Sequence, residues 1–222
     1  VEQDLEGALE KFLAASQDDP ENAEILAATA FIWRRQGKFA EGIERLEEAF
    51  ELSPRWSQLP AHIAGFSHQI RDYAKAVEFY DRTIAVAPDE AFSYYQKAQT
   101  IMLWRIDFDE AQRILESGPG YSVDDERYVR FQTWLSNAAG RFDAAIDLLT
   151  RAPFDWYGQQ ASSIPRSLLL AEAWQMKGDP AEARPQYESA RVAIEQALVD
   201  RPDDYRLFSS LGVALAGLGR AD

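Results

Sequence analysis

Proline recurs at a fixed spacing of 34 residues in the first part of the chain, at Pro20, Pro54 and Pro88. The segment between the first two reads PENAEILAATAFIWRRQGKFAEGIERLEEAFELSP, and Gly37 divides it into two helical patterns. Self-similarity at this period is typical of stacked helical hairpins, in which each repeat buries its apolar face only against its neighbours. The spacing therefore predicts an all-α fold, a solenoid of antiparallel helix pairs.

Within this segment, the apolar positions indicate where each helix begins and ends. The first helix has one apolar face, at positions i, i+3, i+4 and i+7, formed by Leu26, Thr29, Ala30 and Trp33. Gly37 allows the turn, Phe39 begins the second helix, and Pro54 stops it because proline cannot continue a helix. Small residues such as Gly42 let the two backbones approach closely, so a bulkier residue there is expected to cost about 1–3 kcal/mol.

The same pattern extends over the whole chain and predicts one repeat domain, residues 1–222. It is composed of a half repeat at 1–19, full repeats at about 23–54, 57–88, 91–118, 124–153 and 164–200, and a half repeat at 205–222. The third repeat is shifted by one residue at Phe108, and the second turn has Arg71 where the first has Gly37. Pro185 lies early in the last complete helix, which predicts a late start or a kink there.

The connection from Pro153 to Ile164 is long for this architecture and rich in aromatic residues. Long loops in compact domains are often functional. The alternative is that Phe154, Trp156 and Tyr157 cover an exposed edge of the array.

Composition excludes several classes of function. The net charge is −14, from 23 basic and 37 acidic residues, which argues against duplex nucleic acid as a partner. The chain has no cysteine, so it has no disulfide, cysteine nucleophile or cysteine metal site. There is no apolar run of about 20 residues and no signal peptide, and we expect a cytoplasmic location. Because Val1 falls inside a repeat, we also expect a fragment of a longer protein.

These features resemble the tetratricopeptide repeat family. The matching runs are Gly37-Lys38-Phe39 with Ala49 and Pro54, Tyr73 with Ala76, Tyr80 and Pro88, Gly140-Arg141-Phe142 with Ala145, and Leu211-Gly212 with Gly219. The resemblance implies that the solenoid is a right-handed superhelix. It also implies a scaffold that binds proteins or peptides, without catalytic residues and without a cofactor. The chain is also loosely similar to the arrays attached to bacterial signalling and regulatory proteins.

In this family the first helices of successive repeats line a concave groove, which implies a set of inward-facing residues here. By equivalence between repeats they are Phe31, Arg34, Arg35, His62, His68, Gln69, Phe92, Tyr95, Gln99, Met102, Arg127, Arg130, Trp134 and Asn137. This set concentrates arginine, both histidines and aromatic residues in an acidic chain, which suits an anionic or carboxylate-bearing peptide. The alternative is that the arginines are solvated or pair with acidic residues of neighbouring repeats.

Other kinds of site are not indicated. His62 and His68 are six residues apart, whereas helical metal pairs need a spacing of three or four, so we expect no metal. No glycine-rich phosphate loop or nucleophile elbow is present. The Lys and Asn clamp of chaperone-binding arrays is absent, because the corresponding helices offer Ala27, Phe31, His62 and Gly65.

The leading hypothesis is a non-catalytic scaffold domain of a larger protein. One alternative is a ligand-sensing regulatory domain of a bacterial signalling protein, and a weaker one is an array attached to an enzyme. Both terminal half repeats are expected to expose apolar faces and to favour end-to-end self-association. These faces are Leu5, Leu9 and Phe12 at one end and Leu207, Leu211, Leu215 and Leu218 at the other.

Overall fold

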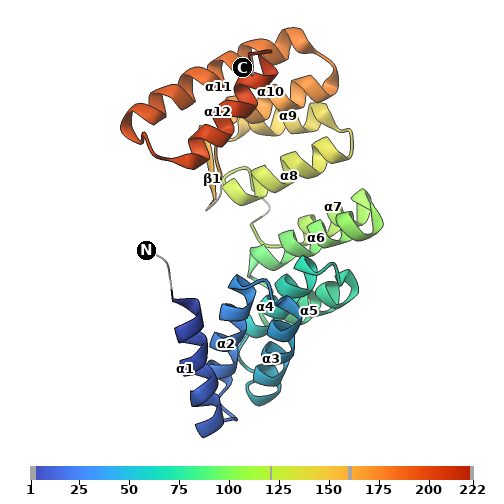
Figure 1. The fold of residues 1–222 in the computed structure, drawn as a ribbon. Coiled ribbons are helices and arrows are strands. Elements are labelled where there is room, and N and C mark those ends of the chain that lie inside the picture. Colours follow the sequence, from blue (N-terminus) through green and yellow to red (C-terminus); the bar gives the residue numbers. More distant parts are fainter. Residues whose placement is uncertain (1–3, 121, 160–161, 221–222) are drawn as a thin grey trace. The chain divides into compact units, whose positions relative to one another are not determined.

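The computed structural model describes residues 4–120, 122–159 and 162–220, which form helices α1 to α12 and one two-stranded sheet (Figure 1). The chain divides into two compact units, with the boundary between Pro119 and Gly120. We refer to them as the first and second units and describe each by itself. The predicted helical fold class is confirmed.

The first unit is built from helical hairpins. Its helices are α1 (Leu5–Asp18), α2 (Ala23–Arg35), α3 (Phe39–Leu52), α4 (Gln58–Gln69), α5 (Tyr73–Val86), α6 (Ala91–Arg105) and α7 (Phe108–Ser117). The pairs α2–α3, α4–α5 and α6–α7 each pack together, and each pair packs on the next through α3–α4 and α5–α6. Helix α1 packs on α2. Each helix therefore contacts mainly its neighbours in sequence, as a repeat array requires.

The periodic prolines end helices in the way the sequence predicts. Helices α1, α3 and α5 each end two residues before Pro20, Pro54 or Pro88. The residue before each proline leaves the helical conformation; Ser53, for example, has φ −134° and ψ 66°. The proline ring clashes with a helical residue before it, so the 34-residue spacing fixes the helix ends.

The turns inside the hairpins share one hydrogen-bond pattern. Gly37 has a φ of 76°, and the N–H of Lys38 donates to the carbonyl of Trp33 at 2.9 Å, which is the Schellman motif. Arg71 takes the place of the glycine in the next hairpin with a φ of 64°, and Asp72 N–H donates to the carbonyl of Ser67 at 2.9 Å. The turn thus forms without glycine, although an L-residue in this conformation is strained by about 1–2 kcal/mol.

Replacing Arg71 by glycine is expected to raise the free energy of unfolding by up to about 1 kcal/mol. The strain it relieves exceeds the entropy that glycine adds to the unfolded chain. The reverse change, Gly37→Arg, introduces the same strain at the matched position and should destabilise by a similar amount. Urea denaturation of both variants checks this, and a loss of stability in Arg71→Gly would contradict it.

Small residues allow the helices of the first unit to approach closely. Ala30, Ala49, Ala64 and Ala76 are fully buried in one core with Leu46. A Cβ atom added to Gly42 would lie 2.8 Å from Cε2 of Phe66, a distance that real Cβ contacts do not show. The close contact between α3 and Phe66 of α4 therefore requires glycine at position 42.

The shifted third repeat has a local cause. Helix α6 (Ala91–Arg105) has 15 residues, against 13 in α2 (Ala23–Arg35). It is followed directly by Ile106, which has a φ of 56° and is 71% exposed. The longer first helix moves the start of α7 to Phe108.

The second unit continues the helical pattern. Its elements are α8 (Glu126–Ala138), α9 (Phe142–Arg151), β1 (Trp156–Gln159), β2 (Ser162–Pro165), α10 (Arg166–Lys177), α11 (Pro180–Asp200) and α12 (Tyr205–Gly217). Each helix packs on the next one in sequence. Tyr187 and Ile194 of α11 lie in its core together with Leu168 of α10 and Leu207 of α12.

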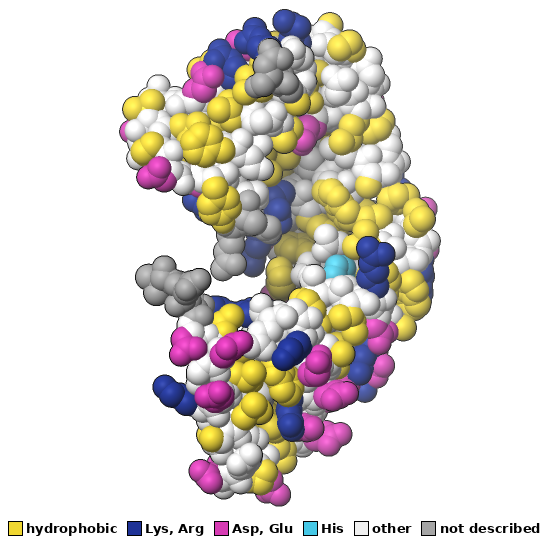
Figure 2. Space-filling view, viewed as in Figure 1, with side chains coloured by type: hydrophobic (Ala, Val, Ile, Leu, Met, Phe, Trp, Pro, Cys, Tyr) yellow, Lys and Arg dark blue, Asp and Glu magenta, His cyan; other side chains and the backbone are white. Residues whose placement is uncertain are grey.

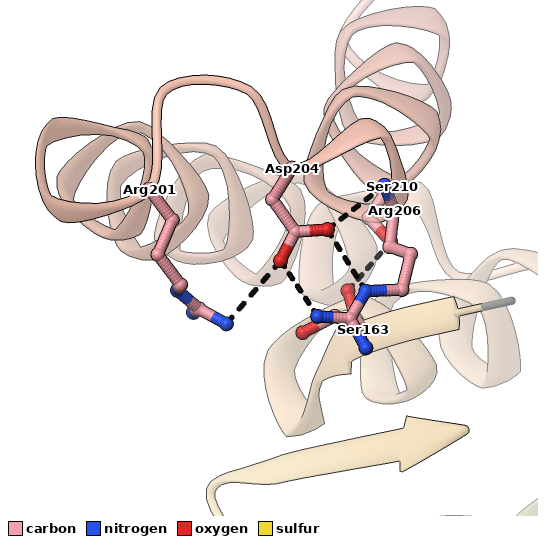
Figure 3. Close-up of polar contacts among 5 residues, drawn as sticks. All are labelled: Ser163, Arg201, Asp204, Arg206 and Ser210. Atoms are coloured by element: carbon pink, nitrogen blue, oxygen red, sulfur yellow. Dashed lines mark hydrogen bonds and ion pairs between the residues drawn. The ribbon is translucent and has the colours of Figure 1, made fainter. Parts of the chain in front are cut away.

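The long connection forms a β-hairpin, where the sequence predicted only a loop. Strands β1 and β2 are antiparallel, with Tyr157 opposite Ile164 and Gly158 opposite Ser163. The Gly158 N–H donates to Glu126 Oε1 of α8 at 2.7 Å. Figure 3 shows the bond of the other strand, in which the Ser163 carbonyl accepts from the Ser210 hydroxyl of α12 at 2.8 Å. A backbone polar group at the outer edge of each strand is therefore hydrogen-bonded to a side chain of a helix. These bonds support a hairpin of only four residues per strand.

The aromatic residues of this hairpin belong to the interior. Tyr157 is fully buried and Trp156 packs against the core of the second unit. Arg166, which follows β2, stabilises the segment that precedes β1. Its guanidinium donates to the carbonyl of Ala152 at 2.8 Å and to the carboxylate of Asp155 at 2.9 Å. The structure thus supports the interpretation in which these rings cover an apolar edge.

For the last helices, the predicted late start of α11 and the predicted exposure of Leu207 and Leu218 are wrong, whereas the kink given as the alternative at Pro185 stays a prediction. Helix α11 does not start late, because Asp179 caps it through the N–H of Glu182 and Pro180 occupies its first turn, while Pro185 is exposed. Leu207 and Leu218 of α12 are buried, at 0% and 7% exposure, because that side of the helix packs on α11. The large exposed apolar side chains of α12 are Tyr205, Phe208 and Val213.

Candidate functional site

In the first unit, side chains from α2 and α4 form an arginine–aromatic cluster, which we define as Phe31, Arg34, His62 and Phe66. The Phe31 ring lies edge-on to His62, with ring centroids 4.7 Å apart, and 6.4 Å from Phe66. The Arg34 guanidinium lies 5.9 Å from the Phe31 ring centroid and 5.7 Å from that of Phe66. Phe66 is 2% exposed and belongs to the core of the first unit, whereas Arg34 is exposed to solvent.

Arg34 differs from the other cations that lie over aromatic rings. Arg45 lies over Trp33 and also pairs with Glu48 at 2.6 Å. Arg82 over Phe79 pairs with Glu78, Arg105 over Trp104 with Glu110, and Lys177 over Trp174 with Asp143. Within the described residues, Arg34 makes no ion pair and no hydrogen bond. Its five N–H donors are therefore available to an incoming acceptor.

His62 contributes a neutral ring to the cluster. Burial lowers the pKa of His62 below its ordinary value, and the charge of Arg34 lowers it further. The imidazole is therefore uncharged at pH 7, and the positive charge of the cluster is that of Arg34.

His68 connects the first helices of two successive repeats. Its Nδ1 lies 2.8 Å from Oγ1 of Thr100 on α6, and the Thr100 hydroxyl donates to the carbonyl of Gln96 at 2.8 Å. Because that hydroxyl proton is already used, His68 Nδ1 must be the donor, which leaves Nε2 as an acceptor. Burial lowers the pKa of His68 as well, so this ring is also neutral at pH 7.

In the second unit, α8 holds the other predicted inner-face residues, and their charges are partly engaged. Arg127 lies 3.7 Å from Asp125, the residue that caps the helix. Burial lowers the pKa of Arg130, and the carboxylate of Glu126 opposes that shift. The Trp134 ring lies 5.3 Å from that of Phe131.

A small cavity in the second unit was not predicted from the sequence. It has a volume of about 110 Å³ and is formed by α10, α12 and β2. Its lining residues are Ser162, Ile164, Leu168, Glu172, Arg206, Ser209, Ser210 and Val213. Glu172 stands six residues before Gly178, as Phe31 stands six before Gly37, and counting back from the turn would have identified it.

Comparison with known proteins identifies the fold. No protein-family model matches the sequence, and no curated protein sequence matches it. A tetratricopeptide repeat protein from Parabacteroides merdae has a similar structure, with a TM-score of 0.69 and 16% identity over 96% of this chain and 93% of that one. The chain has the fold of a tetratricopeptide repeat array. Two further tetratricopeptide repeat structures agree with this. The C-terminal part of a protein from Cytophaga hutchinsonii gives a TM-score of 0.67 and 13% identity over 96% of this chain and 90% of that one. A tetratricopeptide repeat protein from Thermus thermophilus gives a TM-score of 0.61 and 16% identity over 88% of this chain and 100% of that one.

The exposed fractions of the side chains separate the accessible predicted groove residues from the buried ones. Phe92 is 46% exposed, Arg35 and Gln69 are exposed, and Gln99 is half-buried. Tyr95 and Met102, in contrast, are 4% and 8% exposed and lie in the interior of the first unit. On α8, Trp134 is 36% exposed and Asn137 is half-buried. We therefore leave Tyr95 and Met102 out of the proposed surface.

Acidic side chains are numerous over the part of the first unit that holds α1 to α3, with hydrophobic side chains between them (Figure 2). Among the described residues, no group of three or more His, Asp or Glu side chains is placed to hold a metal ion. None of the described helices is both long and apolar enough to cross a membrane.

Proposed function

We propose that this tetratricopeptide array is a non-catalytic scaffold that binds an acidic segment of a partner protein. The contact is made by the arginine–aromatic cluster of the first unit. The observation that carries this proposal concerns the guanidinium of Arg34, which lies over two rings. Among the residues that the structure describes, it has no carboxylate partner, whereas Arg45, Arg82, Arg105 and Lys177 each have one. A Glu or Asp side chain of a bound segment supplies that missing partner.

The chemistry of the cluster suits such a segment. A planar guanidinium binds a carboxylate through two parallel hydrogen bonds, which fixes orientation as well as providing affinity. Phe31 and Phe66 hold Arg34 in place beforehand, so less side-chain entropy is lost on binding. Because the whole chain carries a charge of −14, recognition of an anion must come from this local charge and not from the overall field.

Two exposed residues on the first helices of the next repeats are available for further contacts with a bound segment. Gln69 at the end of α4 is exposed and offers an amide donor. Phe92 at the start of α6 is exposed and offers an apolar contact. We propose that the bound segment combines acidic residues, which pair with arginine, and aromatic residues, which contact an exposed phenylalanine.

The test is a selection of random short peptides on the full chain, followed by affinity measurement on one selected peptide. We expect enrichment of Asp and Glu among the selected peptides. In fluorescence anisotropy, Arg34→Gln should weaken binding of that peptide by about 10- to 100-fold, because the hydrogen-bonded ion pair with the carboxylate is lost. Replacing the acidic residues of the peptide by Asn and Gln should weaken binding to a similar degree.

Arg82→Gln is the matched control, because Arg82 also lies over a phenylalanine ring but already pairs with Glu78. Its affinity for the peptide should equal that of the unchanged protein. Selection of neutral or basic peptides, or equal binding by Arg34→Gln and the unchanged protein, would contradict the proposal.

A further inference from the structure

The cavity of the second unit has a polar side and an apolar side. Glu172 of α10 and Ser209 and Ser210 of α12 provide the polar groups, together with Ser162 and Arg206. Ile164, Leu168 and Val213 provide the apolar wall. The volume of about 110 Å³ equals that of three to four water molecules in the liquid, so the site accommodates a group of about four non-hydrogen atoms.

The strongest hydrogen-bond donors of this cavity are already engaged. The Ser210 hydroxyl donates to the carbonyl of Ser163 at 2.8 Å, which leaves its oxygen lone pairs as acceptors. Arg206 directs Nε and Nη2 to the two carboxylate oxygens of Asp204, each at 2.8 Å, and Arg201 lies 3.4 Å from the same carboxylate (Figure 3). The remaining polar groups of the lining are the Glu172 carboxylate and the hydroxyls of Ser162 and Ser209, all of which can accept a hydrogen bond.

Glu172 is the strongest of these acceptors. Within the described residues it makes no hydrogen bond and no ion pair, although it is half-buried. Asp204 already compensates the positive charge of Arg206, and the neighbouring Tyr187 of α11 is uncharged at pH 7. Burial raises the pKa of Glu172, the direction expected for a carboxyl that lacks a cationic partner.

We propose that this cavity binds a small primary ammonium group, with Glu172 as its counter-ion, Ser209 and Ser210 as further acceptors, and Ile164, Leu168 and Val213 around its short alkyl stem. An ammonium group has three donors and no acceptor, which matches the polar side of the cavity. This site lies in the second unit and is independent of the proposed acidic-segment surface of the first. It gives the array a small-ligand site of the kind that a sensing domain needs.

The experiment uses the full chain labelled with ¹⁵N and propylammonium as the probe, with propan-1-ol as a neutral probe of the same size. We expect propylammonium to shift the amide signals of Ser209 and Ser210 with a dissociation constant of about 1 mM or weaker, as its four non-hydrogen atoms allow. Propan-1-ol should bind at least about 10-fold more weakly, because it lacks the charge.

Glu172→Gln keeps the size of the side chain and should weaken propylammonium binding by about 10- to 100-fold. Glu182→Gln, on the exposed first turn of α11, is the matched control and should leave binding unchanged. If propylammonium and propan-1-ol shift the amide signals of the unchanged protein equally, the proposal is overturned. Undiminished binding of propylammonium by Glu172→Gln would also overturn it. If propylammonium binds, N-acetyl-lysine methylamide and a glycyl peptide amide then show whether a lysine side chain or a peptide N-terminus is the better source of the ammonium group.

Discussion

Replacing Phe66 by alanine is expected to lower the free energy of unfolding by about 3–5 kcal/mol, the usual cost of removing a buried phenylalanine ring. Phe66 is 2% exposed and belongs to the core cluster of the first unit. Its ring lies edge-on to Phe39 of α3, with centroids 5.9 Å apart, and contacts Phe31 of α2 at 6.4 Å. The ring therefore joins the first hairpin to the second, and its loss leaves a cavity at the seam between them.

Urea denaturation followed by tryptophan fluorescence and circular dichroism measures this effect. Phe92→Ala is the matched control, since Phe92 is also on a first helix but is 46% exposed, and it should cost no more than about 1 kcal/mol. Equal losses in the two variants would contradict the packing described for α3 and α4.

Two glycine-to-alanine changes on neighbouring helices are expected to have opposite signs. Gly65 lies inside α4 with nothing within 4 Å of an added Cβ, so Gly65→Ala should stabilise by about 1 kcal/mol through helix propensity alone. Gly42 lies inside α3 and gains the same propensity, but its Cβ would meet the Phe66 ring at 2.8 Å. The net result for Gly42→Ala should be a loss of about 1–2 kcal/mol.

The same denaturation measurements apply here, and a double variant identifies the cause. Phe66→Leu frees space beside Gly42, so adding it to Gly42→Ala should cost less than the sum of the two single changes. Additive losses would mean that the Gly42 variant fails for another reason, and stabilisation by Gly42→Ala would contradict the close approach of α3 and α4.

The helices were predictable because their ends depend on local backbone chemistry. Pro20, Pro54 and Pro88 stop helices through the steric effect on the preceding residue, and Gly37 adopts the left-handed conformation that closes the first hairpin. The Schellman turn is so well supported by its hydrogen bonds that Arg71 adopts it without glycine. The proline stops and the turn residues recur in successive repeats, so the period of the sequence indicates where the helices end.

The features that the sequence did not reveal depend on contacts between distant segments. The β-hairpin is held by Glu126 and Ser210, which lie 32 and 47 residues from the strand residues that they bind. Leu207 is buried by α11, and nothing in the periodicity of α12 distinguishes its packed side from its exposed side.

The sequence identified some members of the arginine–aromatic cluster but not all of them, and the binding role of the cluster stays a prediction. Equivalence between repeats identified Phe31, Arg34 and His62, which the structure brings together. It did not identify Phe66, because a core residue that supports an exposed arginine looks like any other core residue in the sequence. In the described part of the chain Arg34 has no carboxylate partner, and this observation carries the functional proposal. It depends on side-chain positions and cannot be inferred from periodicity.

The most direct test of the account is an NMR titration of the ¹⁵N-labelled chain with an acidic, aromatic peptide from the selection. We predict that the largest amide shifts in the first unit fall on α2 and α4 around Phe31, Arg34 and His62, and that the second helices α3 and α5 shift little. The largest shifts falling on α3 and α5, or shifts of equal size in Arg34→Gln, would contradict the assignment of this surface.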